Sequence, residues 1–209
     1  VVGDKSLHVL KLRNQCVDIM DIFAEVLPNA THLFMYRNAI DWLSSFHRLR
    51  VKHSVPPPKF TREESIKQMA SYYNRAIRDV EPFFDPSIET YHGLVDRGVG
   101  WLVMMVRYMD VHQTNGEFLA MRYEDLMEQR DETLSAIFER VGLPVSAIEQ
   151  AQKAFTRDSQ AGTKLARDNA QSGNTIQLPD EEIEAVLRIL SQHPIINRPD
   201  IILQGTISV

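Results

Sequence analysis

Cysteine is nearly absent from this chain of 209 residues, because Cys16 is the only one. A single thiol forms neither an intramolecular disulfide nor a paired-cysteine redox or zinc motif, and it favours a reducing compartment, so we expect a cytoplasmic protein. The seven histidines form no HExxH motif and no other paired spacing, so the sequence predicts no metal site. The hydrolase signature GxSxG and the phosphate-loop signature GxxxxGK[ST] are also missing.

Long apolar runs and an excess of positive charge are missing too. No run reaches the roughly 18 apolar residues of a membrane span, because Asp96, Arg97 and Arg107 interrupt the stretch 93–109. The first residues lack the apolar core of a signal peptide. A formal net charge of −5 argues against a nucleic-acid partner, which would favour a basic stripe, so any anion site must be local. The composition, 44% hydrophobic and 24% charged, is that of one globular domain over 1–209.

The predicted elements follow the order of an α/β domain with a parallel sheet. Apolar runs predict strands at 8–12, 31–36 and 118–121, and helical spacing predicts a helix at 16–27. The first two strands and this helix would form a right-handed βαβ unit. Because the first strand begins almost at the first residue, we expect earlier strands to be missing. The expected architecture is therefore three-layered, with helices on both faces of a parallel sheet, and incomplete at its N-terminus.

The remainder of the chain is predicted to be rich in helices. Thr61 and Glu64 have the spacing of a capping box, and Gly142 is placed as a helix C-cap. The proline-rich run 51–60 predicts an exposed loop, and the polar span 156–178 predicts a long loop of the kind that covers a site. Apolar periodicity predicts further helices, at 61–76, 86–113, 131–141, 145–155 and 181–190.

The stretch 31–46 holds the first candidate site. Its apolar half ends at Arg37 and its helical half begins at Asn38, so a guanidinium lies between a strand and a helix. Carboxyl ends of parallel strands and free helix N-termini both favour anions, and arginine adds a bidentate contact to phosphate. Ser45 follows two turns later, about 12 Å along the helix. The alternative is an ion pair between Arg37 and Asp41, with Ser45 as an ordinary helix residue.

Three blocks of this sequence together resemble the sulfotransferases that use 3′-phosphoadenosine 5′-phosphosulfate. One block, at 33–46, runs from YRN into DWLSSF. Another, at 118–144, contains RYEDL and ends on GLP, and the third is 10–16 with the helix after it. The blocks occur in the order that the family has. The resemblance implies the later part of the phosphate-loop-like sulfotransferase fold.

The resemblance also implies roles for four residues. Arg37 and Ser45 would bind the 3′-phosphate of the nucleotide, Tyr123 would border the adenine, and Lys11 would lie near the sulfuryl group. Taken alone, Tyr123 fits equally an aromatic anchor under the strand end, and Lys11 a surface residue. The implied reaction moves a sulfuryl group to a hydroxyl or amine of a small molecule or glycan and releases adenosine 3′,5′-bisphosphate, without a metal.

The chain departs from the family pattern in two ways. The opening strand and phosphosulfate-binding loop have no match in the 209 residues. Arg13 stands where cytosolic members have a histidine base, and arginine does not accept a proton. The acceptor and the base therefore stay unassigned. Ser159, Lys164 and Arg167 are candidates for a late phosphate contact or are solvent-exposed loop residues. Two other functions stay open, a non-catalytic binding module of this fold and a nucleotide-dependent small-molecule kinase.

Overall fold

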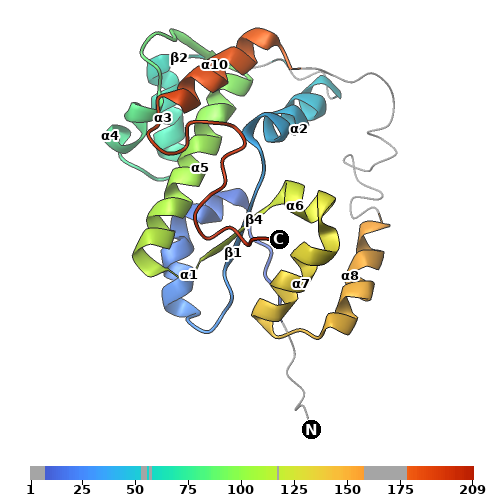
Figure 1. Cartoon of the computed structure of the whole chain (residues 1–209). Coiled ribbons are helices and arrows are strands. Elements are labelled where there is room, and N and C mark those ends of the chain that lie inside the picture. Colours follow the sequence, from blue (N-terminus) through green and yellow to red (C-terminus); the bar gives the residue numbers. More distant parts are fainter. Residues whose placement is uncertain (1–7, 53–55, 57, 117, 158–177) are drawn as a thin grey trace.

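The structure is a computed structural model that describes residues 8–52, 56, 58–116, 118–157 and 178–209. Its architecture is α/β, with helices around a small sheet (Figure 1). The elements of the first half are η1 (Asn14–Ile19), α1 (Met20–Val26), β1 (Leu33–Tyr36), α2 (Ala39–Lys52), β2 (Lys59–Thr61), α3 (Arg62–Tyr72), α4 (Ile77–Val80) and η2 (Glu81–Phe83). Those of the second half are β3 (Thr90–His92), α5 (Leu94–Asn115), β4 (Leu119–Arg122), α6 (Tyr123–Glu128), α7 (Arg130–Val141), η3 (Val145–Ala147), α8 (Ile148–Phe155) and α10 (Asp180–Ser191).

The central sheet joins segments that are far apart in the sequence. β1 and β4 pair in parallel, with Tyr36 opposite Arg122. On the other edge of β4, the Ala120 amide donates to the Gly205 carbonyl at 2.9 Å, and the Ile207 amide donates to the Ala120 carbonyl. The C-terminal tail therefore adds a third, short parallel segment. A separate antiparallel pair is formed by β2 and β3.

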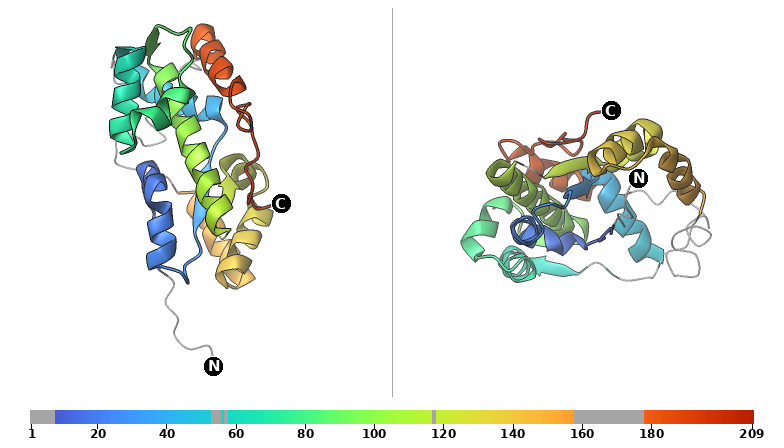
Figure 2. Two further views of the ribbon diagram at one scale, coloured as in Figure 1. Left: turned by 90° about the vertical axis from the view of Figure 1, so that its left-hand side faces the viewer. Right: turned by 90° about the horizontal axis from the view of Figure 1, so that it is seen from below.

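The helix α5 forms the centre of the core. In Figure 2 it runs along the molecule, between α1 and α3 on one side and α10 and the sheet on the other. Trp101 and Tyr108 of α5 are fully buried, and the ring of Phe34 in β1 stacks on Tyr108 at 4.8 Å. Gly98 lets α10 pack closely, because a Cβ there would lie 2.8 Å from Val186. None of the described helices has the length and apolar character needed to cross a membrane.

The predicted strand at 8–12, and with it the βαβ unit, is wrong. Residues 8–13 have no regular structure, and Val9 and Leu10 are 82% and 70% exposed. A strand forms where its backbone groups find a ladder partner, and no hydrogen bond joins 9–12 to β1 in the described structure. The predicted helix at 16–27 is a 3₁₀ turn, η1, followed by the shorter α1.

Local capping signals gave correct predictions. Thr61 Oγ1 accepts from the Glu64 amide at 3.3 Å, and Glu64 Oε2 accepts from the Thr61 amide at 2.8 Å, so the capping box is confirmed. Gly142 ends α7 in the left-handed conformation, with φ of 70°. The predicted long loop at 156–178 lies almost entirely outside the described residues.

Three predicted element boundaries were wrong. The long helix begins at Leu94 and not at residue 86, since Thr90–His92 forms a strand with β2 and Gly93 turns the chain at φ of 59°. α3 ends at Tyr72 and not at residue 76. The proline-rich run is shorter than predicted, because α2 continues to Lys52 and β2 takes its last residues.

We expect Gly205→Ala to lower the free energy of unfolding by about 2–4 kcal/mol. Gly205 has φ of 78°, and a Cβ there would lie 2.5 Å from His112 Cε1 and 2.8 Å from the Tyr108 hydroxyl. Gly142→Ala is the matched control, because φ is 70° and nothing lies within 4 Å of its Cβ. It isolates the backbone strain, about 1 kcal/mol. Equal losses in urea unfolding would show that the tail is not packed against α5 at this point.

We also expect Asp96→Asn to stabilise the protein at neutral pH. Burial between α3 and α5 raises the pKa of Asp96, and Ser65 and Arg97 offset this only in part. The folded state therefore binds the Asp96 proton more tightly than the unfolded chain does. As the pH rises above 3.8, the ordinary pKa of this carboxyl group, ionisation of Asp96 lowers the stability of the fold. Urea unfolding of both proteins at several pH values measures the difference. A gain for the variant that persists below that pKa would contradict the explanation.

Candidate functional site

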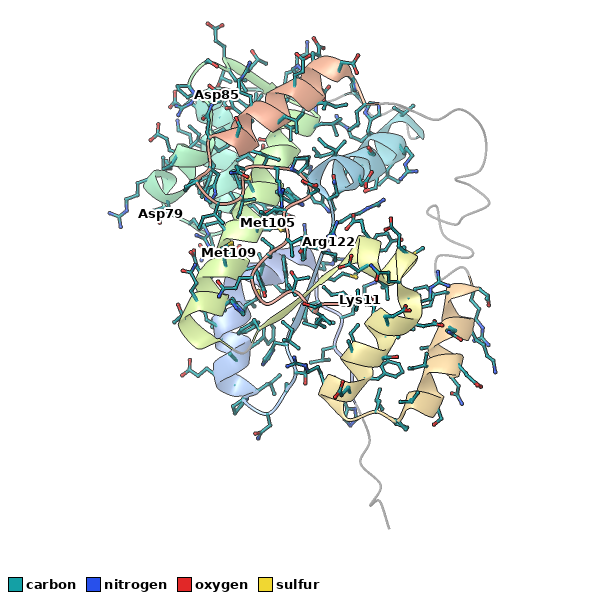
Figure 3. All side chains as sticks on the ribbon, viewed as in Figure 1. Lys11, Asp79, Asp85, Met105, Met109 and Arg122 are labelled. Carbon is teal, nitrogen blue, oxygen red and sulfur yellow. The ribbon has the colours of Figure 1, made fainter. Side chains whose placement is uncertain are left out.

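The carboxyl ends of β1 and β4 bring two of the predicted site residues together. Because Tyr36 lies opposite Arg122, the next residues, Arg37 and Tyr123, leave the sheet side by side. The guanidinium carbon of Arg37 lies 4.9 Å from the centroid of the Tyr123 ring, which is a cation–π contact. Figure 3 labels Arg122 at this end of β4.

Glu124 links the ends of the two strands. Its Oε1 accepts from the Asn38 amide at 2.9 Å and lies 3.8 Å from Arg37 Nε, and its Oε2 lies 4.0 Å from Arg122 Nε. The Glu124 side chain is only 17% exposed. Arg37 Nε and Glu124 Oε2 are both buried and have no hydrogen-bond partner among the described residues. The attraction between Glu124 and the two arginines is therefore electrostatic, without direct hydrogen bonds to Arg37 or Arg122.

The backbone around Arg37 is fixed more firmly than its side chain. Trp101 Nε1 of α5 donates to the Arg37 carbonyl at 2.9 Å. The Tyr36 hydroxyl accepts from the Leu203 amide and bonds to Thr206 Oγ1, and burial raises the pKa of Tyr36. The Arg37 side chain is 30% exposed, and its terminal nitrogens make no hydrogen bond within the described part of the chain. These nitrogens are the groups that are left to bind a ligand.

The expected free N-terminus of α2 is wrong, because the protein itself occupies the amides. Asn38 Oδ1 accepts from the Ile40 amide at 2.9 Å and from the Asp41 amide at 3.4 Å. The Ala39 amide donates to the Pro199 carbonyl at 2.9 Å. The alternative pair between Arg37 and Asp41 is not formed either, since the acidic partner of Arg37 is Glu124.

The other predicted residues do not join this cluster. Ser45 lies two turns along α2 and donates its hydroxyl proton to the Trp42 carbonyl at 2.6 Å. Lys11 is exposed on the irregular stretch before η1 (Figure 3), and no described contact links it to Arg37 or Tyr123. The loop candidates Ser159, Lys164 and Arg167 lie outside the described residues.

Two hollows in the described structure lie away from Arg37. One of about 240 Å³ is bordered by β3, α5 and α10, and His92 and Glu182 face each other there at 3.5 Å. The other, of about 540 Å³, lies between α7 and α8 and is bordered by Arg130 and Lys153. Neither of these two hollows is lined by a predicted site residue.

Sequence reasoning missed Glu124, Asn38 and Trp101 at this site. Glu124 follows Tyr123 directly, so the expected parallel pairing already placed it at the same sheet edge. Asn38 is a frequent helix N-cap residue, which signals that the amides of α2 are used. Trp101 gave no signal, because its bond to Arg37 depends on how α5 packs on the sheet.

Comparison with known proteins does not add to this geometry. The chain matches no family model, no curated protein and no solved structure. The sulfotransferase resemblance therefore depends on the quoted sequence blocks.

We expect Glu124→Ala to lower the free energy of unfolding by about 2–4 kcal/mol, because it leaves the Asn38 amide without its acceptor and removes the negative charge that faces Arg37 and Arg122. Glu124→Gln keeps an acceptor for Asn38 and removes only the charge, so we expect a loss of about 1 kcal/mol. Urea unfolding of both variants measures this. If both are as stable as the parent protein, Glu124 does not hold the strand ends together.

Proposed function

We propose that this chain is the later part of a sulfotransferase domain that uses 3′-phosphoadenosine 5′-phosphosulfate as donor. The proposal includes the three-layer, phosphate-loop-like arrangement of that family. The supporting observation is the contact between Arg37 and Tyr123, whose positions differ by 86. The resemblance assigns both residues to one nucleotide, and the pairing of β1 with β4 brings them within 4.9 Å.

Arg37 is suited to bind the 3′-phosphate through its outer nitrogens. Glu124 faces the inner Nε at 3.8 Å, which leaves the fork of terminal nitrogens for a bidentate contact. Side chains must supply this contact, because the amides that begin α2 are already bonded. The guanidinium covers one face of the Tyr123 ring, so adenine would contact its edge or its other face.

Ser45 and Lys11 have defined tasks in this proposal. The Ser45 hydroxyl donates to Trp42, and phosphate oxygens only accept, so the hydroxyl must rotate to bind the nucleotide. We assign Lys11 to the sulfuryl end of the donor. In the reaction the bond between sulfur and the bridging oxygen breaks, a bond from the acceptor oxygen or nitrogen to sulfur forms, and the acceptor loses a proton. Catalysis would come from positioning and from charge stabilisation.

The position of Lys11 favours a second candidate function, a nucleotide-binding module of the same fold without transfer. Lys11 is exposed on an irregular stretch and has no described contact with the Arg37 cluster. The two candidates share the site at Arg37 and differ in turnover. Release of adenosine 3′,5′-bisphosphate from the phosphosulfate donor in the presence of acceptors would favour the enzyme.

We expect Arg37→Ala to weaken binding of adenosine 3′,5′-bisphosphate by about 1.5–3 kcal/mol, or about 10- to 150-fold, as for a lost charge-assisted hydrogen bond. Calorimetry measures the dissociation constant. Arg78→Ala is the control, because that side chain is 87% exposed on α4. Equal affinity of the folded Arg37→Ala variant and the parent would remove the site. Tighter binding of ATP with magnesium than of the bisphosphate would favour a kinase.

A further inference from the structure

Positive charge is concentrated in one stretch of this acidic chain. Residues 42–62 contain no aspartate or glutamate, although the whole chain has 28 acidic residues and a net charge of −5. The lysines and arginines of this stretch are Arg48, Arg50, Lys52, Lys59 and Arg62. Arg62 is paired with Glu81 at 3.3 Å. Arg48 and Arg50 take part in no ion pair within the described part of the chain.

An arginine of α5 contacts the ring of Phe46, and an arginine of α2 lies one helical turn from that residue. Trp42, Phe46 and Arg50 lie on successive turns of α2, so they share one face of the helix. The rings of Trp42 and Phe46 are 4.6 Å apart, edge to face. From α5, the guanidinium carbon of Arg97 lies 5.3 Å from the centroid of the Phe46 ring. Arg50 therefore lies one turn beyond Phe46 on the same face of α2, and Arg97 contacts the Phe46 ring from α5.

Arg50 takes part in no ion pair with the described residues, and the acid that interacts with Arg97 is its sequence neighbour Asp96. Arg50 Nη2 is buried and has no hydrogen-bond partner there. Arg97 is exposed, and the nearest acid in sequence, Asp96, faces Ser65 on α3. The dipole of α2 favours Arg50 near its C-terminus, but the dipole of α5 disfavours Arg97 in its first turn. The helix dipoles alone therefore do not explain why both Arg50 and Arg97 lie beside Phe46.

We propose that Arg50 and Arg97 form a second anion site, which binds one sulfate, phosphate or carboxylate group over the edge of Phe46. The site is separate from Arg37, since Arg50 lies 11 residues beyond Ala39, where α2 begins, about 16 Å along the helix. The role of this site rests on the proposed function: the acceptor carries a fixed negative charge, and that charged group binds between the two arginines. The existence of the site does not depend on that function.

The two tryptophans of the chain report on the two sites separately. Trp42 touches Phe46, and the Trp101 indole N–H is bonded to the Arg37 carbonyl. We therefore suggest an NMR titration of the two indole N–H signals with sodium sulfate, in which sodium chloride keeps the ionic strength constant. The expected result is a saturable shift of the Trp42 signal. Its dissociation constant should increase at least fivefold in Arg50→Gln and in Arg97→Gln.

Arg48→Gln is the matched control, since it removes the same charge from the same helix on another face, and it should bind sulfate like the parent. Arg50→Lys keeps the charge and should retain binding, which separates loss of charge from loss of fold.

Titration with sodium acetate tests whether the bound group is a carboxylate, because a site for carboxylates binds acetate as well as sulfate. The absence of a saturable Trp42 shift, or equal affinities in all variants, would overturn the proposal. Absence of adenosine 3′,5′-bisphosphate binding in calorimetry would instead remove the proposed function and leave this site intact.

Discussion

The parallel pairing of β1 with β4 is the contact on which the candidate site depends. It sets Tyr36 opposite Arg122, and the next residue on each strand therefore leaves the sheet on the same edge. Arg37 reaches the Tyr123 ring, and Glu124 reaches the Asn38 amide, only because of this register. A slip of β1 by one residue would turn its side chains to the opposite face of the sheet and would separate Phe34 from Tyr108 in the core. Core packing and site geometry are thus fixed by the same ladder.

The protein satisfies the backbone at this edge and leaves side chains unsatisfied. Asn38, Glu124 and the Pro199 carbonyl accept from the amides that begin α2, and Trp101 donates to the Arg37 carbonyl. By contrast, Arg37 Nε and Glu124 Oε2 are buried without hydrogen bonds among the described residues. Buried polar groups without partners are unfavourable, so this cluster favours a ligand or a rearrangement that supplies partners. A ligand at this edge would therefore be bound by side chains, and the dipole of α2 would contribute only through its electric field.

The features that could be predicted from the sequence are those set by neighbouring residues. The capping box at Thr61 and the C-cap at Gly142 need only a few residues, and the structure has both. The stretch 8–12 has the apolar pattern of a strand, but 9–12 pairs with no strand of the described structure, whereas the tail at Gly205 pairs with β4 although no element was predicted there. The resemblance assigned Arg37 and Tyr123 to one nucleotide, and the pairing of β1 with β4 brings the two residues into contact. The indole bond from Trp101 depends on how α5 packs, and no local signal encodes that.

One electrostatic pattern recurs in the described structure. Its three arginine–ring contacts, those of Arg37, Arg97 and Arg130, lie at or just before the N-terminal turn of α2, α5 and α7. A cation is unfavourable there by about 0.3–1 kcal/mol, and a ring face returns about 0.5–1 kcal/mol. Arg37 also faces Glu124, and Arg130 shares its hollow with Asp131 and Glu149. Arg97 has only the ring and its sequence neighbour Asp96, so an added anion would stabilise Arg97 more than either of the other two.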